Sequence, residues 1–251
     1  MIANPDAEAL GTSLATLAEL SLAPQSLRDT LTEIAVIATA AIPGADGAGL
    51  TLLETTRNDT VVASGLFVSA VDEVQYRLRE GPCLLAVEVG AIQMSGSLGG
   101  EPRWPRFGPQ AGRLGVHSVL SLPLMIKQRV IGSLNVYGRA RNAFDTRSVR
   151  NGALFATPAA VTAANALLLE QSRRLTEQLE RALVGRAVVD RAIGIGMSRT
   201  GSAPEEALEH LRRLSRSSGT KLVDVSEQIV LGAASRARER HRAPGPEAPT
   251  D

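Results

Sequence analysis

The stretch "RAVVDRAIGIGMSRTGSAPEEALEHLRRLSRSSGTKLVDVSEQIVL" spans residues 186–231 and contains three short amphipathic segments separated by two turns. In each segment the apolar residues recur at helical spacing, so each segment presents one apolar stripe for burial. In the second and third segments these residues are Ala207, Leu211, Leu214, Leu222, Val225 and Ile229. Three helices of this size predict a small helical bundle.

Two local signals mark the ends of the second helix. Ser202 and Glu205 form the Ser-x-x-Glu pattern of a capping box, and Pro204 lies in the first turn, where its missing N–H is harmless. Gly219 follows the apolar stripe and predicts the turn into the third helix.

Charge is distributed unevenly along the chain. The whole chain of 251 residues has a formal net charge of +1. Residues 171–242 hold 14 Lys or Arg against 9 Asp or Glu, a net of +5, whereas residues 1–170 hold 13 against 15. The basic character therefore coincides with the predicted bundle and favours a partner with a phosphate backbone. A solvated, Arg-rich helical surface is the alternative interpretation of the same count.

The bundle resembles an ANTAR domain, the three-helix RNA-binding module of bacterial transcription antiterminators. The resemblance is carried by "DRAIGIGMSRTG", "EEALEHLRRLS" and "KLVDVSEQIV", which occur in the order and at the spacing of that family. It implies binding to the loops of two small RNA hairpins, which stabilises an antiterminator over a terminator. The sequence departs from the family at Ile193, Gly196 and Ser226.

Basic residues around the predicted turns are the candidate RNA ligands. Guanidinium groups suit RNA because their planar fork binds phosphate oxygens and also stacks on unpaired bases. The candidate RNA-binding residues are Arg191, Arg199, Arg212, Arg213, Ser215, Arg216 and Lys221.

The first two thirds of the chain alternate between helical and extended patterns. Residues 7–20 form a short amphipathic helix, and Ser26 caps a second helix that ends before "PGADGAG" at 43–49. We expect two strands at 50–55 and 60–69, joined by a turn at Asn58-Asp59. Two further strands at 116–126 and 130–138 form the pattern of an antiparallel hairpin. The order of these elements predicts an α+β sensor domain with a central antiparallel β-sheet flanked by helices.

This region resembles a GAF domain, in particular those fused to ANTAR modules in actinobacterial regulators. The motifs are "REGPC" at 79–83, "RWPRF" at 103–107, "LGVHSVLSLPL" at 114–124, "IGSLNVYG" at 131–138 and "FD" at 144–145. Together, the two resemblances imply a GAF-ANTAR regulator, and a small-molecule ligand in the GAF pocket is a further expectation. Because no catalytic motif is evident in the sequence, we expect that the protein is not an enzyme.

A long helical run from about residue 145 to 183 joins the two regions. Pro158 lies inside it, so a kink or a break is expected there. Leu168, Leu175 and Ala182 recur every seven residues, which favours a short coiled-coil-like linker and a homodimer, although a single helix packed on the sheet fits the first half equally. The predicted parts are an N-terminal helix at 1–22, a GAF-like domain at 23–165, a linker at 166–183, an ANTAR-like bundle at 184–235 and a basic, then Pro-rich, disordered tail at 236–251.

Cys83 follows Gly81-Pro82 at a predicted helix start, which is a setting that lowers the pKa of a thiol. A redox or ligand-pocket role is one interpretation, and a small buried apolar residue is the other.

The three histidines lie apart without a catalytic pattern, and we expect no cofactor and no metal site. The N-terminus lacks a signal-peptide pattern and no run of about 18 apolar residues is evident, so we expect a cytoplasmic protein without a membrane partner.

The leading hypothesis is an antitermination regulator that binds RNA under GAF control. The alternative is a ligand- or redox-sensing or protein-interaction regulator whose ANTAR-like module has lost RNA binding, which the departures at Ile193, Gly196 and Ser226 motivate. An enzyme with a catalytic GAF pocket and a DNA-binding helix-turn-helix protein are weaker alternatives.

Overall fold

The computed structural model describes residues 5–22, 25–53 and 60–242. The chain divides into two compact units, Met1–Gln171 and Ser172–Asp251, and the division falls inside the predicted linker. The domain bounds given above stay a prediction. The elements in chain order are α1 (Pro5–Leu20), α2 (Leu27–Ala41), β1 (Gly47–Leu52), β2 (Thr60–Ala63), α3 (Leu66–Leu78), α4 (Pro82–Val89), β3 (Gln93–Ser95), the 3-10 helix η1 (Leu98–Gly100), α5 (Phe107–Arg113), β4 (Ser118–Ile126), β5 (Arg129–Gly138), α6 (Thr146–Thr200), α7 (Pro204–Ser218) and α8 (Leu222–Arg242).

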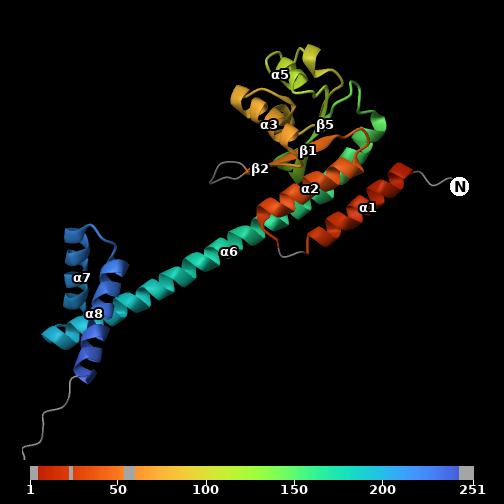
Figure 1. Ribbon diagram of the computed structural model, residues 1–251. Helices are drawn as coiled ribbons and strands as arrows, with labels where there is room; N and C mark the ends of the chain where they lie inside the picture. Colours follow the sequence, from red (N-terminus) through yellow and green to blue (C-terminus); the bar gives the residue numbers. More distant parts are fainter. Residues whose placement is uncertain (1–4, 23–24, 54–59, 243–251) are drawn as a thin grey trace, which may run out of the picture. The chain divides into compact units, whose positions relative to one another are not determined.

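The N-terminal unit is built on a five-stranded antiparallel sheet in the order β2-β1-β5-β4-β3. Helix α2 and the first part of α6 cover one face of this sheet, with α1 packed against α2, and α3, α4 and α5 lie on the other face (Figure 1). Successive residues of a strand point to opposite faces, so β5 sends Leu134 and Val136 into the first layer and Asn135 and Tyr137 into the second. The predicted α+β fold with a central antiparallel sheet is confirmed.

The two layers differ in chemistry. The layer under α1, α2 and α6 is apolar, with Leu31 and Ile34 of α2 against Leu50 and Phe155. Ser26 caps α2 as predicted, because its hydroxyl accepts a hydrogen bond from the Asp29 N–H at 3.2 Å. The layer under α3 to α5 combines an apolar cluster with a group of buried polar side chains, and this polar group forms part of the candidate site described below.

The strand predicted at 60–69 is correct only at its start. Strand β2 ends at Ala63, and α3 begins at Leu66 after Gly65, whose extended backbone starts the helix. The apolar run continues across this break, and so periodicity alone gives no sign of the change. The turn predicted at Asn58-Asp59, the end of the strand predicted at 50–55 and the tail from 243 lie outside the described residues.

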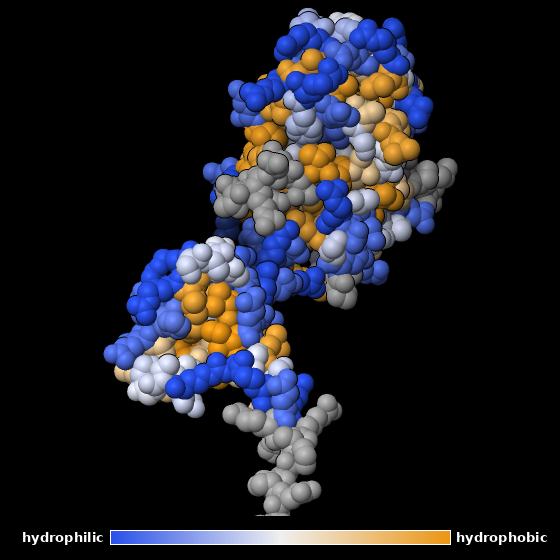
Figure 2. Space-filling model, turned by 60° about the vertical axis from the view of Figure 1, so that its left-hand side comes forward, coloured by the Kyte–Doolittle hydropathy of each residue, from blue (hydrophilic) through white to orange (hydrophobic). Residues whose placement is uncertain are grey.

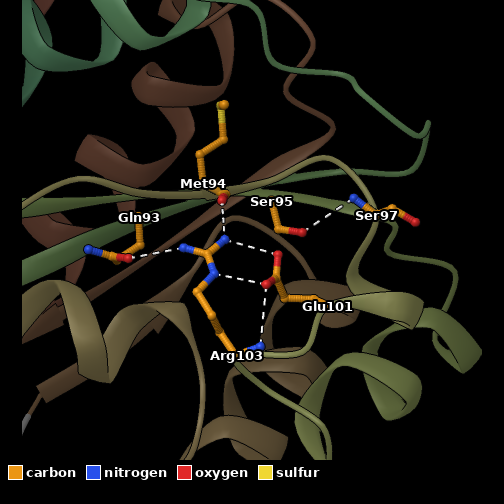
Figure 3. A network of polar contacts seen from close by, with 6 residues as sticks. All are labelled: Gln93, Met94, Ser95, Ser97, Glu101 and Arg103. Atoms are coloured by element: carbon orange, nitrogen blue, oxygen red, sulfur yellow. Dashed lines mark hydrogen bonds and ion pairs between the residues drawn. The ribbon is translucent and has the colours of Figure 1, made fainter.

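Arg103 closes the edge of the sheet at β3. Its guanidinium donates to both carboxylate oxygens of Glu101, at 2.8 and 2.9 Å, and to the Met94 carbonyl at 2.6 Å (Figure 3). These bonds lower the pKa of Glu101 to about 2, because a charge-assisted pair favours the ionised carboxylate. The network satisfies a backbone acceptor on an edge strand that is otherwise open to pairing.

Helix α6 runs unbroken from Thr146 to Thr200 with Pro158 inside it, so the break offered as one outcome at this proline does not occur. The proline cannot bond the carbonyl of Leu154, but Leu154 is half-exposed and water can serve that oxygen. Phe155 and Ala159 on the inner face are fully buried and hold the helix on the sheet.

Helix α6 is long and apolar enough, by length and composition, to cross a membrane. The expectation that no such apolar run exists is therefore wrong for this helix.

The C-terminal unit consists of the end of α6, α7 and α8, which confirms the predicted three-helix bundle. Gly201 and Gly219 end α6 and α7 with φ of 68° and 65°, a left-handed conformation that favours glycine. The predicted capping box of Ser202 and Glu205 does not form, because Pro204 begins α7 and the N-cap is Ala203, which has no side-chain acceptor. The Ala203 N–H therefore donates to Glu206 at 3.3 Å, whereas Ser202 bonds Thr200.

Candidate functional site

The candidate RNA-binding residues gather chiefly on α7. Ala207 and Leu211 of this helix are buried, and Arg212, Arg213 and Arg216 lie on its exposed side. At 3.6 residues per turn these three arginines share one face, away from the buried stripe. The structure therefore brings together three of the seven candidates on one exposed face of α7.

Glu209 organises this surface, and the sequence analysis did not single it out. Its carboxylate accepts a hydrogen bond from Arg216 at 2.7 Å and lies 3.8 Å from Arg212. The bond from Arg216, together with the neighbouring positive charges, lowers the pKa of Glu209. The side chains are 48 to 65% exposed, so the pairs are weak surface interactions that phosphate groups can replace.

The other four candidates occupy different positions. The Ser215 hydroxyl donates to the Thr220 carbonyl at 2.7 Å and thus stabilises the turn between α7 and α8. Arg199 lies in the last turn of α6 and shares a hollow with Arg213. Arg191 and Lys221 are exposed but are not among the residues that line this hollow.

The hollow lies within the C-terminal unit and has a volume of about 800 Å³. Ile195, Leu211 and Ile229 give it an apolar floor, and Arg199 and Arg213 supply charge. Figure 2 shows apolar surface gathered in one area of this unit, with hydrophilic residues around it. Arg236 of α8 lines a second, smaller hollow with Arg199 and is a further basic residue that the turn-centred sequence analysis missed.

The three departures from the family pattern lie within the packing of this bundle. Ser226 is buried and donates its hydroxyl hydrogen bond to Leu222 within α8 at 2.8 Å. A Cβ at Gly196 would lie 3.5 Å from that of Ala207, an ordinary van der Waals distance, so an alanine side chain would fit between α6 and α7 at this position. Ile193 is half-buried. None of the three belongs to the exposed arginine face of α7.

The second candidate site is the polar group between the sheet and α3 of the N-terminal unit. Asp72 is buried, and one of its carboxylate oxygens accepts hydrogen bonds from Tyr137 at 2.5 Å, Gln75 at 3.2 Å and Asn135 at 3.4 Å. Burial raises the pKa of Asp72 to about 7, although these bonds act in the opposite direction. The other carboxylate oxygen has no hydrogen-bond partner among the described residues.

Cys83 adjoins this group. Its backbone N–H donates to Gln75 at 3.0 Å, and its sulfur lies 3.6 Å from the Tyr76 hydroxyl. The thiol is 1% exposed, and burial raises its pKa, which is the reverse of the effect expected from the helix N-terminus. The buried interpretation of Cys83 is therefore the one that its surroundings favour.

Hydrogen bonds to Glu80 join the motif "REGPC" at 79–83 to the motif "RWPRF" at 103–107. Glu80 accepts from the backbone N–H groups of Arg106 and Phe107 at 2.7 and 2.9 Å, and from the Arg106 side chain at 2.8 Å. Burial alone would raise the pKa of Glu80, but these bonds lower it. Trp104 is buried in the apolar cluster, as expected for a packing residue.

Family comparisons agree with both units. A model described as the GAF domain matches residues 24–162, more than half of the chain, and a model described as the ANTAR domain matches residues 177–230. The chain belongs to the GAF family and carries an ANTAR domain, so it is a GAF-ANTAR regulator. This architecture is that of an RNA-binding antitermination regulator with a sensory domain.

Solved structures support the fold of the N-terminal unit. The GAF domain of a phosphoenolpyruvate-protein phosphotransferase from Coxiella burnetii is 18% identical with a TM-score of 0.52, covering 64% of this chain and 96% of that one. The GAF domain of the Acinetobacter phosphoenolpyruvate-protein phosphotransferase is 16% identical with a TM-score of 0.51, covering 66% and 97%. At such identities the likeness concerns the fold alone. No protein with a curated description matches the chain.

Proposed function

We propose that this protein binds the hairpin loops of nascent RNA through the exposed face of α7 and thereby favours antitermination. The observation that carries the proposal is the set of three exposed arginines, Arg212, Arg213 and Arg216, on one face of the ANTAR domain. An RNA loop offers phosphates and unstacked bases to such a face, whereas a regular A-form groove hides its base edges.

The chemistry of the face fits RNA loops by charge and by stacking on guanidinium groups. Residues 172–242 contain no Phe, Tyr or Trp, so aromatic stacking on bases is not available in this unit. Arginine fulfils both tasks, since its plane stacks on a base and its edge binds phosphate. Arg191, Arg199 and Lys221 are exposed and are proposed as further RNA contacts outside this face, and the Ser215 hydroxyl stabilises the turn between α7 and α8.

The N-terminal unit is proposed to sense the signal that controls RNA binding. A hollow of about 440 Å³ beside β2 is lined by Asp72, Tyr76 and Arg28, and offers a small molecule both charge and hydroxyl groups. A ligand shifts the protein only between states that it binds unequally, so the signal must favour one arrangement of α6. We place the protein in the cytoplasm, where nascent RNA is found, as a homodimer joined through residues 166–183.

Binding to a leader RNA with tandem hairpins, measured over a salt series, tests the proposal. The variant is Arg212→Ala/Arg213→Ala, and the matched control is Arg129→Ala/Arg141→Ala, which removes two exposed arginines from the N-terminal unit. We expect loop-dependent binding that weakens with salt, a loss of roughly 10-fold or more in the α7 variant, and a shallower salt dependence. Binding that ignores the loop sequence, or equal losses in both double variants, would contradict it.

A further inference from the structure

The hollow beside β2 lies between α2 and α3 at one edge of the sheet. Its volume of about 440 Å³ falls within the range of pockets that bind small molecules. Arg28 and Thr32 of α2 line one side, Asp72 and Glu73 of α3 line the other, and β2 contributes residues 61–63. Every lining residue belongs to the N-terminal unit, so the hollow lies within that unit.

The two helices bring opposite charges to this hollow. Arg28 of α2 is exposed and positively charged, whereas α3 presents the carboxyl groups of Asp72 and Glu73. Among the described residues, Arg28 donates a hydrogen bond of 3.4 Å to the Val61 carbonyl and forms no ion pair with either carboxyl group. The two charges of the hollow therefore do not neutralise one another, and a molecule that carries both signs complements them.

Asp72 brings a buried acceptor without a donor to the hollow. Its side chain is 1% exposed, and one carboxylate oxygen accepts the three hydrogen bonds described above. The other oxygen, Oδ2, has no partner among the described residues, and it faces β1 at Gly49, where a Cβ would overlap it. Gly49 pairs with Ala63, which lines the hollow, so this oxygen lies on the inner side of the hollow. A buried acceptor without a donor is unfavourable, and a ligand N–H placed there removes that cost.

We propose that this hollow binds a small zwitterion of the α-amino acid class. The ammonium group donates to Oδ2 of Asp72, with Glu73 as a second acceptor, and the carboxylate group binds the Arg28 guanidinium. Charge-assisted hydrogen bonds of this kind are about twice as strong as neutral ones. An anion leaves Oδ2 of Asp72 without a donor, and a simple amine leaves the Arg28 charge without a partner, so both bind less tightly. The inference rests on the sensory role proposed above and names the ligand class.

Isothermal titration calorimetry of the full chain with each common amino acid in turn tests this assignment. Burial raises the pKa of Asp72 to about 7, so titrations at about pH 8 keep its carboxyl group mostly ionised. For an amino acid that binds, the matched controls are the carboxylic acid that lacks the ammonium group and the amine that lacks the carboxylate group. We expect each control to bind at least roughly tenfold more weakly. The absence of binding by every amino acid, or equal affinity for either control, would overturn the proposal.

Two variants separate the contributions of the two sides of the hollow. Asp72→Asn stays neutral and should weaken binding of the amino acid by roughly tenfold or more, whereas Arg28→Gln should weaken binding of the amino acid and leave binding of the amine control unchanged. Arg129→Gln, which removes an exposed arginine outside the hollow, should alter neither. Fluorescence of Trp104, the sole tryptophan, verifies that the N-terminal unit of each variant is folded. Equal losses for the amino acid and the amine in Arg28→Gln would overturn the assignment.

Measuring RNA binding with and without the amino acid separates this inference from the sensory role on which it rests. An amino acid that binds and changes the affinity for the tandem-hairpin RNA supports both proposals. An amino acid that binds through Asp72 and Arg28 without changing the affinity for RNA supports the ligand class and contradicts the sensory role. Loop-dependent RNA binding without binding of any amino acid overturns the ligand class alone.

Discussion

The buried carboxyl of Asp72 makes the stability of the N-terminal unit depend on pH, and Asp72→Asn should remove that dependence. The pKa of Asp72 is raised to about 7 in the folded protein from 3.8, chiefly by burial. A raised pKa means that the folded state holds a proton that the unfolded state has released. The resulting stability is present below the unfolded pKa and is lost as pH rises through 7.

The size of the effect follows from linkage. Each pH unit between the two pKa values changes the free energy of unfolding by about 1.4 kcal/mol, so wild type loses about 2 kcal/mol between roughly pH 5.5 and pH 8 from this group. Because Asp72 is 1% exposed, solvent screening gives little reduction. The asparagine stays neutral and keeps an acceptor oxygen for Tyr137 and Gln75.

Urea denaturation followed by Trp104 fluorescence is the suitable assay, because the only tryptophan lies in the N-terminal unit and reports on that unit in the full chain. The difference in unfolding free energy between wild type and Asp72→Asn should move by about 2 kcal/mol in favour of the variant from about pH 5.5 to about pH 8. The control is Glu73→Gln, an exposed neighbour on the same helix. Parallel pH profiles for wild type and Asp72→Asn would refute the reasoning.

Three further outcomes follow from the same contacts. Gly81→Ala should destabilise the N-terminal unit by roughly 2 kcal/mol or more, since Gly81 has φ of 155° and a Cβ there would collide with Gln75. In the same urea titration Gly99→Ala, which faces open space, should change stability little. Cys83 should react with a thiol reagent only as the protein unfolds, and rapid labelling of the native state, followed by absorbance, would contradict its burial. Glu209→Gln should tighten RNA binding by roughly two- to tenfold, because Arg212 and Arg216 lose a competing carboxylate, and an unchanged affinity in a filter-binding assay would argue against their phosphate contacts.

Sequence patterns predicted the elements whose signals are local. The Ser26 cap and the antiparallel hairpin at 118–138 carry their own signals and are confirmed. The start of α3 was missed because Leu66 to Val68 continue an apolar run after only Ser64 and Gly65. Helix α6 continues through Pro158 because Phe155 before it and Ala159 after it are buried against the sheet. This packing is a tertiary effect, and the helix propensities of single residues give no information about it.

The candidate sites divide in the same way. The arginines of α7 follow from charge and helical phase, and the structure places three of them on one face, although their contact with RNA stays a prediction. Burial of Asp72, Gln75 and Asn135 could not be read from the sequence, since polar residues on a strand or helix are normally assigned to the solvent side. Only the pairing of β5 with β1 and the packing of α3 over the sheet bring them together.

The hydrogen bonds among Asp72, Tyr137 and Gln75 also bear on what the sensory unit can recognise. The space among these three side chains is filled by the bonds that they make with one another, and the hollow of about 440 Å³ lies beside it. A small molecule that enters beside Asp72 exchanges these internal bonds for its own, and the net affinity is the difference between two similar sets. A ligand that reproduces the pattern of donors around the carboxyl therefore binds more tightly than a ligand of the same size that does not. Selectivity for a ligand at this position thus depends on the ligand's polar groups more than on its volume.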